Sequence, residues 1–507
     1  MSTIPAMRMR LALAAPLAAL AVVAAGCGGS SKSTGSASGS EAGATVIPAS
    51  AVAYVSINSD LGSDQWKKAD ALSKRFPGRA KAFADFQKEL AKQNLDFQKD
   101  VKPALGPEID VAWLDFADNG QNVVAVTQPK DDAKLAALVK KNNSDPSSQK
   151  LYTEKVGDWT ALAGSQARLD RLKSAQNGAK LADDSTFKDA VADLPGDALV
   201  KAYLNGQAAR QAIKGSLPSS ATTNGFLAGT PLGNLQWLSA GAASESKGIR
   251  LAIGEKGPGG GKNYSPELVH ALPAGAWGYL SFTDLASGLR QGINALKSTP
   301  GFEKGRAQVE QALGLSLEQD LLPIFSGEGA VAVYPGAAGS RIPSIDFVVK
   351  VSDEAKARHV LQRLVALARL GNIGAVRPVT VAGVSATELR PTGVNVAIDV
   401  AVSKGMLVVT NSRSALGAIG GSGKKLADDP LYKSARSDAK APSQTNSLIY
   451  MNLHAALPAI LDLAGAYGSS SAGLVQARAN TAPLQSILLY STRNGDVTRG
   501  DGFLQIK

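Results

Sequence analysis

An internal repeat constrains this chain more than any other feature of its sequence. Blocks of the N-terminal half return in the same order about 220 to 250 residues later. The matched blocks are PASAVAYVSIN from Pro48 with PAGAWGYLSFT from Pro273, DVKPALGPEIDVA from Asp100 with DLLPIFSGEGAVA from Asp320, and LADDSTFKDA from Leu181 with LADDPLYKSA from Leu426. The spacing is fixed within a block and changes only between blocks, as loop insertions in two copies of one ancestor would produce. The sequence therefore predicts two homologous tandem domains.

A glycine-rich segment separates the two copies. Residues 254–265, GEKGPGGGKNYS, have the glycine and proline content of an interdomain linker, so the domains are expected at 46–253 and 266–507. The second copy is longer by about 25 residues after its acid-capped helix. Because VNVAIDVAV from Val394 alternates with a period of two, as a half-buried strand does, we expect an extra hairpin near 371–402.

Both copies show one order of predicted elements. A strand is followed by two helices broken at Pro-Gly, a short turn, two strands, an acid-capped helix, two strands, and the LADD helix. Strands that follow one another directly favour antiparallel pairing. The predicted fold class is α+β, each domain being a mainly antiparallel sheet with helices packed on one face. Aromatic residues make up 5% of the chain against 44% hydrophobic residues, so small aliphatic side chains must fill the cores.

The N-terminus has the order of a secretory signal. Basic residues precede an apolar run, and small residues lead into Cys27, the single cysteine of the chain. Ala24 to Cys27 resemble the lipobox of bacterial lipoproteins, although Ala24 stands where that motif usually has leucine. We expect cleavage of residues 1–26, lipidation of Cys27 and a disordered Gly/Ser tether over 27–45, with the protein at the outer face of the cell membrane. The alternative is an ordinary secreted protein with an incidental cysteine.

The repeated blocks also resemble a known family. The Pro-Ala-x-x-x-x-Tyr opening, the Asp-to-Pro-to-Glu turn and the Leu-Ala-Asp-Asp helix are similar to those of actinobacterial secreted proteins and lipoproteins catalogued as a domain of unknown function. The resemblance covers nearly the whole mature chain and implies location and fold. It implies no activity, ligand or catalytic residue.

The sequence shows no catalytic constellation. The three histidines, His270, His359 and His454, lie far apart, and none is shared between the copies. Since the one cysteine is expected to carry lipid, it cannot serve in a zinc set or as a nucleophile. The glycine-rich stretches from Gly257 and Gly417 lack the hydroxyl residue that follows lysine in a phosphate-binding loop. We therefore expect a protein that is not an enzyme and that holds no cofactor.

Paired acidic residues are the polar feature that both copies share. Asp100 with Glu108 in the first copy corresponds to Asp320 with Glu328 in the second. Such carboxylates could ligate calcium or act as general acid and base. They could equally be helix caps and turn anchors, because Asp100 can accept backbone N–H groups at a helix start. We favour the structural role and retain these four residues as candidate calcium ligands.

Charge and apolar content limit the possible partners. The formal net charge is +11, but basic residues are dispersed among acids, so nucleic acid is not an expected partner. We expect a non-catalytic binding or scaffolding protein of the cell envelope. The alternative is a carrier of a lipid or other apolar ligand, because LHAALPAILDLAGAYG from Leu453 is more apolar than its counterpart from Gly206. The ligand or envelope partner, the oligomeric state and the biological process stay open.

Overall fold

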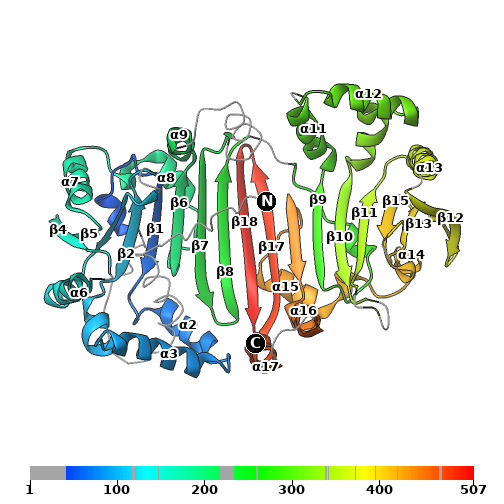
Figure 1. The fold of residues 1–507 in the computed structure, drawn as a ribbon. Coiled ribbons are helices and arrows are strands. Elements are labelled where there is room, and N and C mark those ends of the chain that lie inside the picture. Colours follow the sequence, from blue (N-terminus) through cyan, green and yellow to red (C-terminus); the bar gives the residue numbers. More distant parts are fainter. Residues whose placement is uncertain are drawn as a thin grey trace. The chain divides into compact units, whose positions relative to one another are not determined.

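The computed structural model describes residues 41–116, 120–146, 148–216, 233–258, 261–297, 299–336, 340, 342–371, 373–393, 396–419, 421–466 and 471–507. The chain divides into two compact units, the first comprising Met1–Ser219 with Leu235–Glu255 and the second Ser220–Asn234 with Lys256–Lys507 (Figure 1). No helix among the described residues is long and apolar enough to cross a membrane. The predicted signal peptide and Cys27 lie outside the described residues.

One antiparallel sheet forms the frame of the first unit. Its hydrogen-bonded order is β4–β5–β3–β2–β1–β6–β7, and β8 follows β7 after a short turn and lies beside it (Figure 1). The strands are β1 (Ala53–Asn58), β2 (Glu108–Trp113), β3 (Val123–Thr127), β4 (Tyr152–Val156), β5 (Trp159–Ala163), β6 (Val200–Asn205), β7 (Trp237–Glu245) and β8 (Gly248–Lys256).

Asp131 and Asp184 cap two α-helices of the first unit. Asp131 accepts the backbone N–H of Lys134 at 3.0 Å, and Asp184 accepts that of Phe187 at 2.8 Å. The helical elements are η2 (Ala42–Thr45), α2 (Asp64–Ser73), α3 (Arg79–Lys92), η3 (Phe97–Val101), α4 (Lys102–Ala104), α6 (Asp132–Ser144), α7 (Gln166–Ser174), η4 (Ala175–Asn177), η5 (Leu181–Asp183), α8 (Ser185–Val191) and α9 (Gly206–Ser216).

The end of the predicted tether is folded rather than disordered. Residues 42–45 form η2, in which Gly43 and Ala44 are buried. The backbone N–H of Gly43 donates to Glu108 Oε1 at 2.9 Å. The prediction is therefore wrong for residues 41–45, because the buried carboxylate of Glu108 takes its hydrogen-bond donors from this segment.

The second unit contains a larger antiparallel sheet. Its order is β12–β13–β14–β15–β11–β10–β9–β16–β17–β18. The strands are β9 (Gly278–Thr283), β10 (Glu328–Tyr334), β11 (Ser344–Lys350), β12 (Gly374–Val381), β13 (Val384–Pro391), β14 (Ile398–Ser403), β15 (Met406–Thr410), β16 (Ser447–Met451), β17 (Leu484–Asn494) and β18 (Val497–Ile506). The order β14–β15–β11–β10–β9–β16–β17–β18 in the second unit matches the order β4–β5–β3–β2–β1–β6–β7–β8 in the first. Strands β13 and β12 extend the second sheet beyond β14.

Asp353 and Asp429 cap two helices of the second unit. Asp353 accepts the N–H of Lys356 at 2.9 Å, and Asp429 accepts that of Tyr432 at 3.2 Å. The helical elements are η7 (Leu268–His270), α11 (Leu285–Leu296), α12 (Phe302–Leu313), η8 (Leu317–Leu321), η9 (Leu322–Phe325), α13 (Glu354–Leu370), α14 (Arg413–Ala418), η10 (Leu426–Asp428), α15 (Pro430–Asp438), α16 (Leu453–Ala466) and α17 (Ser471–Thr481).

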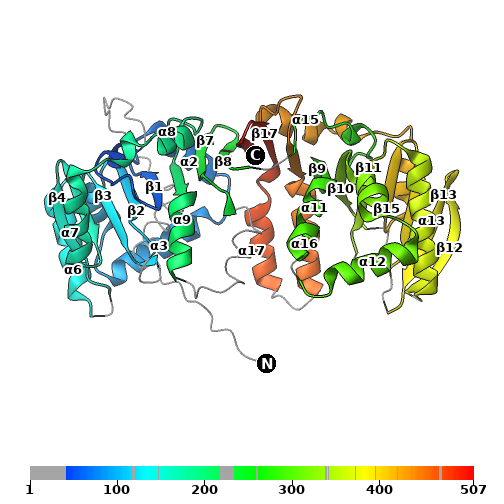
Figure 2. The ribbon, with the colours of Figure 1, turned by 90° about the horizontal axis from the view of Figure 1, so that it is seen from above.

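Helices cover both faces of the second sheet, so the prediction of helices on one face is wrong for this unit. On one face α15 places the ring of Tyr432 between Tyr279 and Tyr450 of the strands. Phe347 lies between Asp346 and Val348 in β11 and therefore points to the opposite face, where α13 packs (Figure 2). The α+β class is correct, but strands that are apolar on both sides require cover on both sides.

Candidate apolar binding pocket

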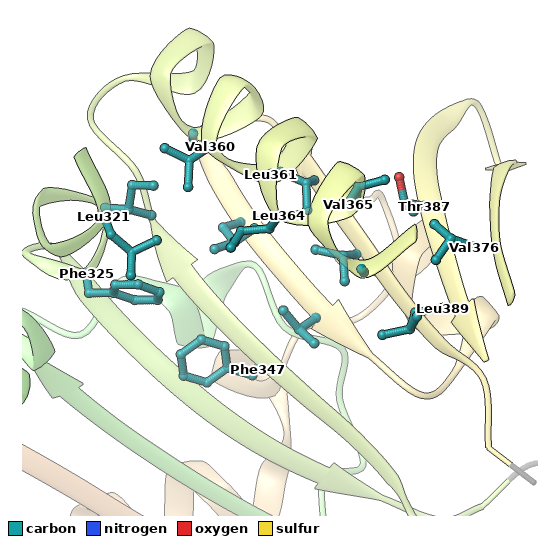
Figure 3. A pocket seen from close by; sticks show the side chains of 16 residues that line it. Leu321, Phe325, Phe347, Val360, Leu361, Leu364, Val365, Val376, Thr387 and Leu389 are labelled. Atoms are coloured by element: carbon teal, nitrogen blue, oxygen red, sulfur yellow. The ribbon is translucent and has the colours of Figure 1, made fainter. Parts of the chain in front are cut away.

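A pocket of about 280 Å³ lies between α13 and the sheet of the second unit (Figure 3). Helix α13 presents Ala357, Val360, Leu361, Leu364, Val365 and Ala368 to it. The strands contribute Phe347, Val376, Thr387, Leu389, Val400, Leu407 and Val409. Leu321, Ile324 and Phe325, from η8 and η9, also line it.

The sequence of the strands explains why the pocket is apolar. Along β11, β15 and β14, every second side chain faces α13, so Phe347, Val409 and Val400 lie opposite one another across the ladder. Thr387 carries the one polar side chain among the described residues that line the pocket. The pocket can therefore bind an apolar group, and its described lining holds no carboxylate, imidazole, amine or thiol.

The hairpin of β12 and β13 supplies one wall. Its two-residue turn has positive φ at both positions, 49° at Ala382 and 79° at Gly383, which suits a tight hairpin. At Gly374, where β12 begins, a Cβ atom would lie 2.1 Å from the carbonyl oxygen of Arg390, so only glycine allows this pairing. The hairpin thereby brings Val376 and Leu389 to the pocket.

A second cavity of about 510 Å³ flanks α13 and shares the lining residues Leu361, Val365, Thr387 and Val400 with the first. This cavity is more polar. Its lining includes Arg358, whose guanidinium donates to the carbonyl oxygen of Val402 from Nε at 3.3 Å and from Nη2 at 3.2 Å. The apolar pocket thus has a polar neighbour on the same helix.

Buried acids lie on the opposite face of the same sheet. Glu388 accepts hydrogen bonds from Arg390, Arg377 and Arg413, and these guanidinium groups lower its pKa to about 2. Asp346 accepts from Thr410 Oγ1 at 2.6 Å, while burial raises its pKa to about 6. The arginines join β12, β13 and α14 through one carboxylate, which is a structural role.

The predicted calcium ligands of the first unit have different partners. Asp100 Oδ2 accepts the backbone N–H of Asp96 at 2.8 Å, which lowers the pKa of Asp100, and Lys134 Nζ lies 3.7 Å from it. Glu108 instead accepts the N–H groups of Glu41 and Gly43. The two carboxylates therefore bind backbone at two separate places.

The second unit repeats this arrangement. Asp320 accepts the N–H of Ser316 at 2.8 Å, which lowers the pKa of Asp320. Glu328 accepts the N–H groups of Glu267 at 2.9 Å and Leu268 at 3.0 Å, and burial raises its pKa. Across the described part of the chain, no three His, Cys, Asp or Glu side chains are grouped as a metal site requires.

The sequence directed attention to a different helix. The apolar run from Leu453 forms α16, yet none of the residues lining the pocket belongs to α16. The sequence of α13 does carry a pattern that could have indicated the pocket. Apolar residues recur at helical spacing within an otherwise basic segment, at Val360, Leu361, Leu364, Val365 and Ala368.

Comparisons with known proteins give little beyond the family. No curated protein matches this chain. Three solved crystal forms of a protein named TP0453 are similar at low levels. Form III has 13% identity over 46% of this chain and 79% of that chain, with a TM-score of 0.24. Form IV has 12% identity over 47% of this chain and 93% of that chain, with a TM-score of 0.25. Form I has 14% identity over 46% of this chain and 78% of that chain, with a TM-score of 0.23.

At these TM-scores the likeness supports no statement about fold or function. The family comparison is decisive, because the model described as "Protein of unknown function (DUF3352)" matches residues 11–157 and 138–505. The prediction of a family known as a domain of unknown function is confirmed, and the chain belongs to this family.

Proposed function

We propose that this protein is a non-catalytic binding protein of the cell envelope, anchored through Cys27, that holds an apolar ligand in the pocket beneath α13. The pocket is the observation that carries the proposal. Its volume of about 280 Å³ is close to the lower limit of small-molecule sites, roughly 300 Å³, and its lining is almost wholly apolar. An apolar molecule that leaves water for this lining gains about 25 cal/mol per Å² of buried surface.

We further infer that the two units descend from one duplicated ancestor. The repeated sequence blocks support this, as do the parallel strand orders and the matched capping residues Asp184 and Asp429. In this view the binding wall formed by β12 and β13 was gained by the second copy. The first copy would then serve as a built-in control in binding experiments.

The binding proposal is tested by titrating the full chain with a naphthalene-based fluorescent probe. Leu361→Asn places an amide in the pocket and should weaken binding roughly tenfold, because an unpaired buried polar group costs about 1–3 kcal/mol. Val139→Asn is the matched control, since Val139 follows its cap Asp131 as Leu361 follows Asp353. No probe binding, or equal weakening by both substitutions, would contradict the proposal.

The anchor is tested separately by Cys27→Ser. This substitution removes the thiol that lipidation requires, so the protein should leave the membrane fraction of its own cells. Cell fractionation and immunoblotting measure the change, with Ser30→Ala as a control beyond the lipobox. Unchanged membrane retention of the Cys27→Ser protein would refute the anchor and leave the pocket proposal intact.

A further inference from the structure

An apolar row leads out of the pocket and across the second sheet. Phe347 of β11 lies opposite Val331 of β10, Val331 lies opposite Leu280 of β9, and Leu280 lies opposite Ile449 of β16. Directly opposed residues of antiparallel strands point to the same face with their Cβ atoms about 5 Å apart. Phe347 lines the pocket, so the row is continuous with it.

This face is unusually apolar for a surface that water reaches. Leu280 and Ile449 are each 37% exposed, Met451 on the same face of β16 is 40% exposed, and Ile345 on β11 is 47% exposed. The part of a sheet face that helices leave uncovered ordinarily carries polar residues. A contiguous apolar patch of this kind marks an interaction site.

The backbone around the row selects the kind of occupant. β9, β10, β11 and β16 are each paired on both sides, so none of them has a free edge that could receive another strand. A peptide that entered the pocket would bring N–H and C=O groups to a lining in which, among the described residues, Thr387 alone has a polar side chain. A hydrocarbon chain has no polar group to satisfy and therefore fits both the pocket and the row.

The dimensions set the length of that chain. A methylene group has nearly the volume of a water molecule, about 30 Å³, so the pocket holds roughly nine of them. From Phe347 to Ile449 the row crosses three strand spacings, about 14 Å. An extended residue spans about 3.5 Å over three backbone bonds, so an extended hydrocarbon chain advances about 1.2 Å per bond. The row therefore accommodates roughly twelve more methylene groups.

We propose that the second unit binds the long acyl chain of a lipid, with its methyl end in the pocket and the rest along Val331, Leu280 and Ile449. This rests on the proposed function and adds the ligand class. A short acyl chain would fill the pocket alone. Only a long chain would cover the row, which otherwise stays exposed to water.

The test compares decanoate with icosanoate, a C20 fatty acid whose length matches the pocket and the row together, on the full chain carrying Cys27→Ser, by displacement of a fluorescent fatty acid. Icosanoate should bind at least tenfold more tightly than decanoate, because each added methylene on a half-open face strengthens binding about twofold. Leu280→Asn should reduce icosanoate affinity at least fivefold and leave decanoate affinity within twofold. Leu238→Asn, at a residue of the first unit that is 36% exposed, should change neither.

Ile449→Asn provides a second variant if Leu280→Asn lowers the melting temperature. If neither fatty acid binds, the proposed function fails and this inference fails with it. If decanoate binds but icosanoate binds no more tightly, or if Leu280→Asn and Ile449→Asn leave icosanoate binding unchanged, the row is not part of the site while the pocket proposal stands. Dimerisation abolished by Leu280→Asn would also overturn the inference, because a second copy would then occupy the row.

Discussion

The ring of Tyr432 lies 5.1 Å from the ring of Tyr450 at an interplanar angle of 88°, and Phe187 meets Tyr203 at the same distance and 89°. In each unit the aromatic residue stands three positions after a capping aspartate, Asp429 or Asp184. The cap fixes where the helix begins, and the helix then delivers one ring to the strand tyrosines. Edge-to-face contacts of this kind stabilise by about 0.5–1.5 kcal/mol each beyond the burial of the rings.

Removing the ring of Tyr432 should therefore destabilise the second unit strongly. Tyr432 is 2% exposed, and Tyr432→Ala should lower the free energy of unfolding by about 3–5 kcal/mol through lost burial and the cavity left behind. Tyr432→Phe keeps both ring contacts and places the residue of the first unit there, so it should cost less than about 1.5 kcal/mol. Urea unfolding followed by circular dichroism measures both, and equal losses would show that the hydroxyl rather than the ring matters.

Glu328 should contribute stability through the backbone that it holds. Glu328→Ala leaves the N–H groups of Glu267 and Leu268 without their acceptor, which should cost about 2–4 kcal/mol. Glu328→Gln retains one acceptor oxygen and should lose less. Thermal unfolding of the two variants provides the comparison, and an unchanged melting temperature in Glu328→Ala would show that water replaces the carboxylate.

Sequence reasoning succeeded where the signal was local. The order of strands and helices follows from repeated blocks, and the caps Asp131 and Asp353 act through residues three positions away. The pocket was out of reach because it joins α13 to strands as distant as β11 and β13. The sequence did not predict helices on both faces of the second sheet. Hydrophobic periodicity indicates which residues of a strand share a face, but it does not indicate which element covers that face.

Asp320 separates the structural role of the paired acids from calcium binding. Its carboxylate accepts the N–H of Ser316, and Lys356 lies 3.5 Å away, so Asp320→Ala should lower the melting temperature by removing both interactions. Added calcium should change the melting temperature of neither the original chain nor the variant. Asp100→Ala is the matched substitution in the first unit. Tight calcium binding in calorimetry that disappears in Asp320→Ala would instead establish a metal site.

The buried carboxyl of Asp346 should make stability fall as pH rises. Burial raises its folded-state pKa to about 6 from an ordinary value of 3.8. Below pH 3.8 the group is protonated in both states and costs nothing. Between pH 3.8 and about 6 the unfolded chain ionises first, so the free energy of unfolding declines, and above pH 6 the full cost is roughly 3 kcal/mol.

Asp346→Asn removes this ionisation and keeps an oxygen that can accept from Thr410. The substitution should therefore flatten the decline between pH 4 and 6.5, which urea unfolding at a series of pH values measures. Thr410→Val is the complementary change, because it removes the one hydrogen bond that favours the charged carboxylate and should steepen the decline. Parallel stability curves for the original chain and Asp346→Asn would mean that water solvates this carboxylate within the fold.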